Sequence, residues 1–352
     1  MSDTPGDSGT PHKRRPRYSG THPRRFEEKY KELAAEKYPE IVPHVLAKGR
    51  TPAGQHVPIM VAEVLEVLAP QPGERGVDAT LGWGGHAQRL LERLAPGGQL
   101  LGIDADPFEL PRTEARLRRL GFDETAFITR RTNFAGLRAA IDSAGWHEGA
   151  DFILADLGVS SMQIDDPSRG FSFASDGPLD MRMNPNRGLA AAAWLERASV
   201  EAIVAALRDH ADEPRADRIA AALVAQRGEL VTTQALAVAV RGALEELTRE
   251  DEVDLSVRRV FQALRIEVND EFGALDALLR QLPACLRPGG RVAVLTFHSG
   301  EDRRVKKAFI QGDRDGLYAS IADEVTRATM EEQHANPRSR AAKLRWARLA
   351  TS

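Results

Sequence analysis

The chain has 352 residues, 42% of them hydrophobic, and a formal net charge of −3, so it is long and apolar enough for one large domain and a smaller one. The single cysteine excludes an intrachain disulfide, and no apolar run approaches the roughly 20 residues of a membrane span or the core of a signal peptide. We therefore expect a cytoplasmic protein without a membrane partner, and the total charge by itself does not indicate a nucleic-acid partner.

Residues 1–54 are predicted to form a basic, disordered extension. The first 25 residues hold six Lys or Arg and two acidic residues in a stretch rich in Pro, Gly, Ser and Thr. Such a composition favours a solvated chain that can neutralise phosphates. A short charged helix is expected at 27–39 and a linker at 50–54, so the folded part should begin near Gln55.

Strand-like and helix-length segments then alternate along the chain. The predicted strands lie at 76–81, 99–104, 126–130 and 151–156. This alternation is typical of a doubly wound parallel sheet in an α/β fold.

The alternation stops after residue 163, where a loop-like stretch at 170–185 precedes a run of Ala-, Leu- and Arg-rich segments. Helices are expected at 189–208, 214–227, 232–248 and 257–282, and a fifth strand at 291–296 after a Pro-Gly-Gly turn. We interpret this order as 55–165 forming the first part of a core, 166–261 a helical insertion that recognises the substrate, and 262–352 the second part of the core.

The C-terminal segment 334–352 carries five basic residues and no acidic one. Two interpretations fit this composition equally well. The basic side chains contact RNA phosphates, or they form a solvated surface beside a final strand that Trp346 and Leu349 anchor.

The glycine-rich turn after the first strand is the most informative segment. Gly82, Gly84 and Gly85 lie between a strand and a helix, where the backbone has to approach a ligand closely. Asp104 ends the next strand, where a carboxylate can accept hydrogen bonds from two ribose hydroxyls. Together these features indicate a nucleoside cofactor, and the alternative is a tight turn with no ligand.

The residues around this turn favour one cofactor over another. Asp78 begins the pattern D-x-T-x-G-x-G, which is close to the D-x-G-x-G-x-G opening of class I S-adenosylmethionine methyltransferases. The G-x-G-x-x-G pattern of nicotinamide enzymes fits less well, because Ala87 stands at its third glycine. Asp78 also supplies an acid for a methionyl ammonium, although a carboxylate that caps the turn is the alternative.

A series of further motifs extends this pattern along the chain. They are HVPIM (56–60), DATLGWGGH (78–86), GIDADP (102–107), NF (133–134), DLGVSSMQ (156–163), GFSF (170–173), DGPLDMRM (176–183), FQALRIEVNDE (261–271) and FHSGEDR (297–303). In this order and at these spacings the chain resembles the bacterial 16S ribosomal RNA cytosine-N4 methyltransferases, the MraW family, from about His56 to Arg348. Trp83, the segment 251–259 and Gly300 depart from the family pattern.

The resemblance implies a class I methyltransferase fold, a Rossmann-like doubly wound sheet with an inserted helical domain. It implies S-adenosylmethionine as cofactor and, as partner, 16S rRNA or the small ribosomal subunit near its decoding region. No metal is expected, because His86 has no companion ligands at metal spacing, and a homodimer is left open. The cofactor positions carried over from the family are Gly84, Gly85, His86, Asp104, Phe134, Asp156 and Gln163. For His86 and Phe134 the alternatives are a histidine bonded to the backbone and an ordinary core ring.

The implied reaction is methyl transfer to the exocyclic N4 amine of a cytidine, which needs an acceptor for an amine N–H. Asp156 is the candidate acceptor, because Asp-Leu-Gly-Val-Ser-Ser stands where better-known amino methyltransferases carry a D/N/S-P-P-Y/F tetrapeptide. His298 is a second catalytic candidate because its pKa lies near neutrality, although an ammonium product needs no strong base. Substrate contacts are expected at Ser160, Ser161, Asp180, Arg182 and Ser299. A structural lid is the alternative for the loop 176–183.

Three other classes stay open from the sequence alone. A methyltransferase of DNA or protein would keep the cofactor half without needing the insertion. The remaining possibilities are a nicotinamide-dependent oxidoreductase and a non-catalytic RNA-binding module. Measuring whether the protein binds S-adenosylmethionine or NADH distinguishes these classes of protein.

Overall fold

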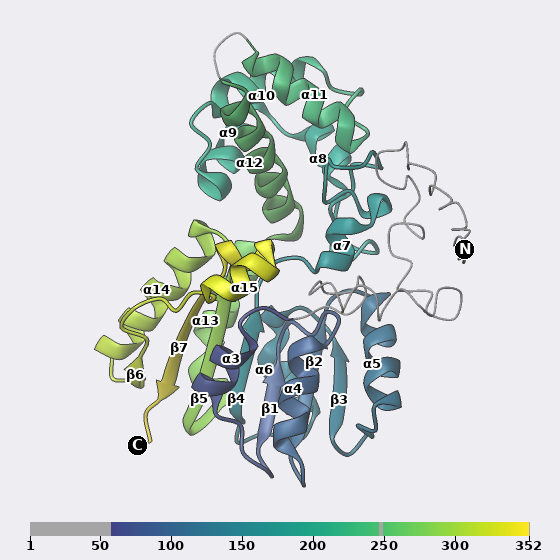
Figure 1. Ribbon diagram of the computed structural model, residues 1–352. Coiled ribbons are helices and arrows are strands. Elements are labelled where there is room, and N and C mark those ends of the chain that lie inside the picture. The colour runs from purple at the N-terminus through teal and green to yellow at the C-terminus, as the bar shows by residue number, and fades with distance from the viewer. Residues whose placement is uncertain (1–57, 246–248, 352) are drawn as a thin grey trace, which may run out of the picture. The chain divides into compact units, whose positions relative to one another are not determined.

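The structure is a computed structural model, and it describes residues 58–245 and 249–351. The expected extension 1–54 and the helix at 27–39 lie outside the described residues. Figure 1 traces the elements in chain order from purple to yellow. In the described part of the chain, no helix combines the length and apolar character that crossing a bilayer requires.

A seven-stranded sheet in the order β3-β2-β1-β4-β5-β7-β6 forms the centre of the fold. Strands β1 to β5 are parallel to one another, and β7 runs antiparallel between β5 and β6. This order with one reversed strand is that of class I methyltransferases, so the predicted fold class is confirmed. The strands are β1 (Arg75–Asp78), β2 (Gln99–Asp104), β3 (Phe127–Arg131), β4 (Ala150–Asp156), β5 (Leu286–Thr296), β6 (Tyr318–Ile321) and β7 (Lys343–Leu349).

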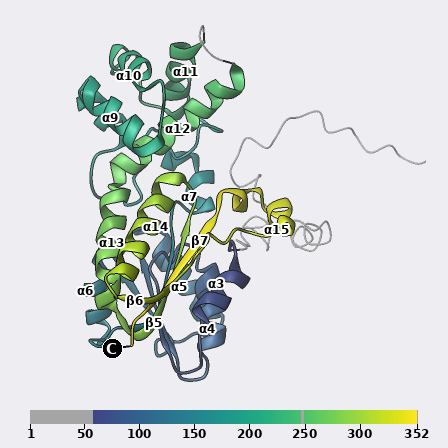
Figure 2. The ribbon, with the colours of Figure 1, turned by 90° about the vertical axis from the view of Figure 1, so that its left-hand side faces the viewer.

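Helices cover both faces of the sheet, as Figure 2 shows for α13 and α14 on one side and α3 and α4 on the other. Side chains alternate along each strand, so Leu100 of β2 belongs to one apolar core while Leu101 and Ile103 belong to the other. The helices are α3 (Val61–Leu68), α4 (Gly85–Leu94), α5 (Glu109–Arg119), α6 (Leu137–Ser143), α13 (Glu271–Cys285) and α14 (Ser299–Arg314).

The first four predicted strands are present, and the observed ends of some strands differ from the predicted ends. β2 has the predicted bounds, while β1 ends at Asp78 rather than at residue 81. The chain turns there because the backbone N–H of Thr80 donates to Asp78 Oδ1 at 3.1 Å. β5 begins at Leu286, before the predicted 291, because Leu286 already pairs with Ala150 ahead of an irregularity in the ladder.

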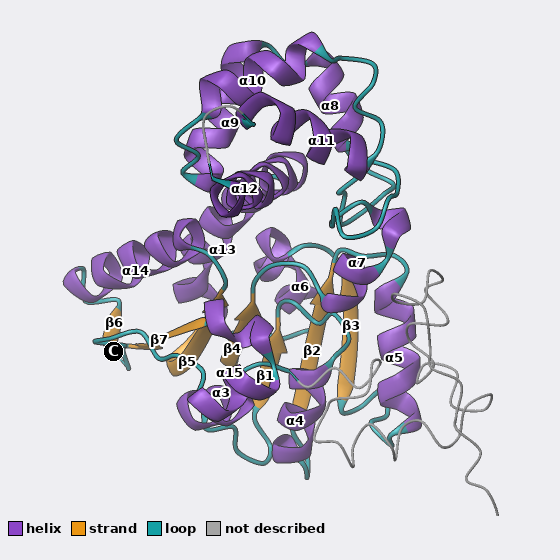
Figure 3. Cartoon of the chain, turned by 45° about the horizontal axis from the view of Figure 1, so that its top comes forward, coloured by secondary structure: helices purple, strands orange, loops and turns teal. Residues whose placement is uncertain are grey.

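Between β4 and α13 the chain forms an all-helical region with an apolar core of its own, seen in purple above the sheet in Figure 3. It comprises α8 (Ala191–Arg197), α9 (Val200–Ala211), α10 (Ala216–Ala225), α11 (Thr233–Leu244) and α12 (Glu250–Asn269). A short helix, α7 (Ser161–Asp165), directly follows β4 and precedes this region.

Two segments predicted as single helices are each two helices in the structure. Within 189–208, Ser199 starts α9, and its hydroxyl accepts from the N–H of Ala202. Within 257–282, Asp270 adopts a left-handed conformation with φ of 47° and separates α12 from α13. The expected domain boundary at 261 therefore lies inside α12. The interruption between the two helices, at Asp270, lies nine residues later.

The basic C-terminal segment contributes the strand β7 to the sheet. Lys343 Nζ and Arg345 Nε lie 3.0 and 2.6 Å from the carboxylate of Asp302 on α14. Arg345 is buried, and Leu349 packs against the apolar core. Of the two interpretations of this segment, the strand is observed, and two of its five basic side chains share the carboxylate of Asp302 inside the fold.

Candidate active site

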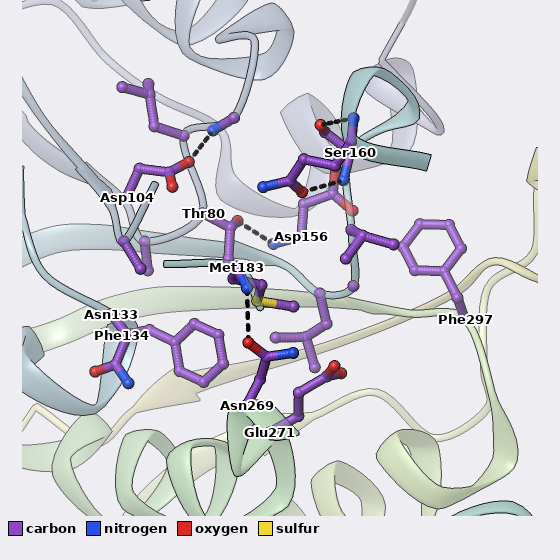
Figure 4. A pocket seen from close by; sticks show the side chains of 18 of the residues that line it. Thr80, Asp104, Asn133, Phe134, Asp156, Ser160, Met183, Asn269, Glu271 and Phe297 are labelled. Atoms are coloured by element: carbon purple, nitrogen blue, oxygen red, sulfur yellow. Dashed lines mark hydrogen bonds between the residues drawn. The ribbon is translucent and has the colours of Figure 1, made fainter. Parts of the chain in front are cut away.

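A cavity of about 400 Å³ lies at the carboxyl ends of the parallel strands. Its walls come from the turns after β1 to β5, from α7, from the α12–α13 junction and from a 3₁₀ turn, η4 (Pro337–Ala341). Figure 4 shows side chains from the turns after the strands and from the α12–α13 junction around the opening. The volume is within the range of sites for small organic ligands.

The glycine turn forms one wall of the cavity. Gly82 and Gly84 have φ of 47° and 76°, and a Cβ on Gly84 would lie 2.7 Å from Thr113 Cγ2, so a side chain is excluded there. Arg116 Nη2 donates to the carbonyls of Trp83 and Gly84 at 2.7 and 3.1 Å. Helix α5 thus fixes the turn from behind. A Cβ on Gly82 would meet no other atom closer than 3.8 Å, so its backbone is open to a ligand.

Asp104 ends β2 with both carboxylate oxygens in use by the backbone. Oδ2 accepts from the N–H of Gly82 at 2.7 Å, and Oδ1 accepts from that of Asp106 at 2.8 Å (Figure 4 shows the first). Burial raises the pKa of Asp104 to about 6, although these two bonds act in the opposite direction. Each oxygen keeps a second lone pair, which suits a pair of ribose hydroxyls.

Phe134 follows β3 and opens the 3₁₀ turn η2 (Phe134–Gly136). The residue lines the cavity and also packs against the apolar core under the sheet. Phe134 is therefore in part a core ring and in part a cavity residue, the two interpretations that the sequence allowed. Its apolar surface suits a nucleobase.

Asp156 and His86 meet at the end of β4. The backbone N–H of Asp156 donates to Thr80 Oγ1 at 2.6 Å, as Figure 4 shows. His86 Nδ1 lies 3.4 Å from Asp156 Oδ2, and its Nε2 lies 2.9 Å from the Ile59 carbonyl oxygen. Both ring nitrogens of His86 thus face groups of the chain itself. Asp156 Oδ1 is enclosed and has no hydrogen-bond partner.

The charges around this pair determine the protonation of His86. Burial by itself lowers the pKa of His86, but the hydrogen bond and charge of Asp156 and the charge of Asp78 outweigh it, and the pKa is raised. Burial in turn raises the pKa of Asp78 to about 6. Asp78 is 2% exposed and is not among the cavity residues, and its Oδ1 accepts from the N–H of Thr80 and so caps the turn.

Gln163 and Ser160 line the cavity but use their polar groups to fix α7. Ser160 Oγ accepts from the N–H of Gln163, and Gln163 Oε1 accepts from the N–H of Ser160. Gln163 Nε2 also donates to Asp106 Oδ2 at 2.9 Å. Ser161 is the first residue of α7.

The loop 176–183 reaches the cavity through a residue that the sequence did not single out. Asp180 and Arg182 bond to each other at 2.7 and 2.8 Å and are not among the cavity residues, whereas Met183 is. The N–H of Met183 donates to Asn269 Oδ1 at 2.7 Å (Figure 4). Asn269 at the end of α12 therefore holds this loop against the site.

Arg169 makes a second set of hydrogen bonds that hold the loop 176–183, and the sequence analysis did not identify it. Its Nη1 donates to Asp106 Oδ2 at 2.8 Å, and its Nη2 donates to the carbonyls of Arg182 and Met183. One guanidinium thus joins the end of β2 to the loop. The motif GFSF at 170–173, directly after Arg169, was the available signal.

His298 and Ser299 stand outside the cavity. His298 Nε2 lies 3.2 Å from Glu301 Oε1, and its ring packs against that of Phe272. Ser299 Oγ donates to Asp212 Oδ2 at 3.3 Å. The structure does not bring these two residues to the site, and the preceding Phe297 lines it instead.

A charged pair that the sequence did not assign lies at the α12–α13 junction. Arg265 Nε and Nη2 donate to the two oxygens of Glu271 at 2.8 and 2.9 Å, and both residues line the cavity. Burial lowers the pKa of Arg265, but the charge of Glu271 outweighs this effect and the pKa is raised. The motif at 261–271 contained both residues without giving either a role.

Within the described ranges, no three His, Cys, Asp or Glu side chains are arranged to hold a metal ion.

Comparison with known proteins places these features in a family. The model of the MraW methylase family matches residues 53–350. "Ribosomal RNA small subunit methyltransferase H 2" of Alkaliphilus metalliredigens is 50% identical over 341 residues, covering 95% of this chain and 97% of that protein. "Ribosomal RNA small subunit methyltransferase H 1" of Lachnoclostridium phytofermentans is 47% identical, covering 96% and 93%, and that of Agathobacter rectalis is 46% identical, covering 96% and 97%. With the sheet order and the cavity at its carboxyl edge, these matches show that the chain belongs to the MraW methylase family.

Proposed function

We propose that the chain transfers a methyl group from S-adenosylmethionine to the N4 amine of a cytidine in the 16S rRNA of the small ribosomal subunit. The observation that carries the proposal is the position of Asp156, an acceptor-only side chain that lines the same cavity as the glycine turn and Asp104. The names of the relatives support a ribosomal RNA substrate.

The residues present fit the cofactor. The open backbone of Gly82, the remaining lone pairs of Asp104 and the ring of Phe134 suit a methionyl chain, a ribose and an adenine in turn. When bound, S-adenosylmethionine supplies an electrophilic methyl group, whose bond to sulfur breaks as the amine lone pair forms the new N–C bond.

The chain's own residues orient the amine. Asp156 accepts an N–H of the target N4 and so fixes the direction of its lone pair. Thr80 Oγ1 accepts from the backbone N–H of Asp156 and so holds this residue, and the His86 ring lies beside its carboxylate. Helices α8 to α12 recognise the RNA, a role supported by Met183 and Asn269, which reach the cavity from that region.

The homodimer that the sequence leaves open stays a prediction. We infer that the protein works in the cytoplasm, where ribosomal subunits are assembled.

The test is methylation of small subunits that lack the modification. We expect the purified protein to form N4-methylcytidine at one position, identified by mass spectrometry of the digested RNA, and to bind S-adenosylmethionine but not NADH in calorimetry. Free 16S rRNA run in parallel decides which form is the substrate. Methylation of DNA or protein alone would refute the proposal.

A further inference from the structure

We propose that His86 and Asp156 together accept the proton that the target amine releases, and that the Ile59 carbonyl selects the ring nitrogen that receives it. This inference deepens the proposed function and rests on it. It gives His86 a part in the reaction other than contact with the cofactor.

The hydrogen-bond geometry carries the argument. The Ile59 carbonyl oxygen accepts only, and it lies 2.9 Å from His86 Nε2, so Nε2 carries a proton. In a neutral imidazole Nδ1 then has a lone pair, and it faces Asp156 Oδ2, another acceptor, at 3.4 Å. Two acceptors that face each other are satisfied only when one further proton lies between them. The pair can therefore take up one additional proton, and it acts as the acceptor in the state that lacks this proton.

The surroundings strengthen this arrangement. His86 is 6% exposed, so water does not compete for Nδ1. The charged groups that act on it are the carboxylates of Asp156 on β4 and Asp78 on β1, and both favour a protonated ring. Asp104 on β2 adds a further negative charge beside Asp78.

Asp156 connects the ring to the cavity. Its side chain is 28% exposed, while Oδ1 is enclosed by the chain. The oxygen left for the cavity is therefore Oδ2, the same oxygen that faces His86. An amine held by Oδ2 is one proton transfer from the carboxylate and two from Nδ1.

The proton step balances without a further reactant. As the new N–C bond forms, N4 gains positive charge, and one N4–H bond breaks in the same step. The electron pair of that bond stays on N4, and the proton forms a bond to Asp156 Oδ2. Transfer to His86 Nδ1 gives an imidazolium beside a carboxylate, which returns the proton to solvent after the product leaves.

Two substitutions separate proton acceptance from orientation. His86→Asn keeps a donor near the Nδ1 position but cannot take up a proton, and His86→Gln keeps a donor toward Ile59. We expect either change to lower kcat at least tenfold, in line with general-base contributions, while the KM for S-adenosylmethionine changes less than about threefold. Wild-type kcat should fall as the pH is lowered and the pair fills with its proton, and His86→Asn should lose this dependence.

A matched control exists on the surface. His147 Nδ1 lies 3.5 Å from Asp142 Oδ1, but the His147 side chain is 77% exposed and does not line the cavity. His147→Asn should leave kcat and its pH profile unchanged. If His86→Asn instead retains the wild-type rate and pH profile, His86 is only structural and the inference is wrong.

A second measurement does not depend on activity. In protein labelled with ¹⁵N at the histidine rings, the His86 signal, identified by its loss in His86→Asn, should titrate at Nδ1 while Nε2 stays protonated, and Asp156→Asn should lower its pKa. If Nε2 is unprotonated, or if Nδ1 does not titrate between about pH 5 and 9, the proposed proton-accepting pair is wrong even in an active enzyme. A wild-type protein that methylates no RNA overturns the proposed function, and the catalytic part of the inference with it.

Discussion

Asp104 shows how a single buried carboxylate organises the cofactor wall. It holds the N–H groups of Gly82 and Asp106, so it shapes the glycine turn as well as facing the cavity. Because the sequence placed Asp104 at the end of a strand, its position could be predicted. Its bond to the turn could not, since it depends on two strands lying side by side.

The first prediction is that Asp104→Ala weakens S-adenosylmethionine binding by about 2–3 kcal/mol, because charge-assisted hydrogen bonds to the ribose are lost. Calorimetry on folded protein measures this. Asp217→Ala is the control, because Asp217 is 70% exposed and pairs with Arg208 on the surface. Wild-type affinity in a folded Asp104→Ala protein would remove Asp104 from the site.

The second prediction concerns pH. The pKa of Asp104 is raised to about 6, and hydrogen bonds from a ribose stabilise its ionised form. Cofactor affinity should therefore be constant above that pH and fall by up to about tenfold per unit below it. Calorimetric titrations from neutral to mildly acidic pH test this, and an affinity that rises on acidification would contradict it.

The third prediction is that Asp78→Asn stabilises the protein without ligand at pH 8. Burial raises the pKa of Asp78 from its ordinary value of 3.8 to about 6, so the folded state binds more protons than the unfolded state between these values. Stability is therefore lost as the pH rises through this window, by up to about 3 kcal/mol. Urea unfolding should show the gain at pH 8 and little difference near pH 4.

At the scale of elements, patterns along the chain predicted the strands better than the helix ends. Gln99–Asp104 is an apolar run between turns, which suits a buried strand, and its bounds agree with β2. The break at Asp270 could not be predicted, because an aspartate rather than a glycine takes the left-handed conformation there. The ties made by Arg169 and Asn269 join residues that lie far apart in the sequence, so no local pattern reveals them.

The fourth prediction tests one of these ties. Asn269→Ala removes the bonds that Asn269 makes to Met183 N–H and the Met181 carbonyl, so the loop should leave the cavity wall. We expect the KM for RNA to rise by roughly tenfold, which corresponds to about 1.4 kcal/mol, with unchanged binding of S-adenosylmethionine. Asn186→Ala, at an exposed position three residues after this loop, should change neither. Equal loss of both affinities would mean that Asn269 supports the whole site.

At the scale of the molecule, charge is distributed unevenly although its total is small. Lys343 and Arg345 share the carboxylate of Asp302, whereas Arg338 lines the cavity from η4 and remains 45% exposed beside Asp165. The relatives align over about 95% of the chain, more than the family model spans, so part of the basic N-terminal segment also has counterparts in them.

The fifth prediction is that removing residues 1–50 lowers RNA affinity and flattens its dependence on salt. Each lost phosphate contact should change the slope of log K against log salt by somewhat under one unit. The methylated cytidine should stay the same, because its choice depends on the pocket around Asp156. An unchanged slope would mean that the segment does not contact RNA, and a changed methylation position would mean that it reads the sequence.

The insertion of α8 to α12 into the connection between β4 and β5 also bears on the order in which the chain folds. β4 ends at Asp156 and its parallel partner begins only at Leu286, so this central pairing closes a very long loop. The helices between them have an apolar core of their own, and the contacts in that core join residues closer in sequence than the β4–β5 pairing does, so they form faster. The helical region is therefore expected to be in place before the sheet closes, and the cavity exists only after that last and slowest event.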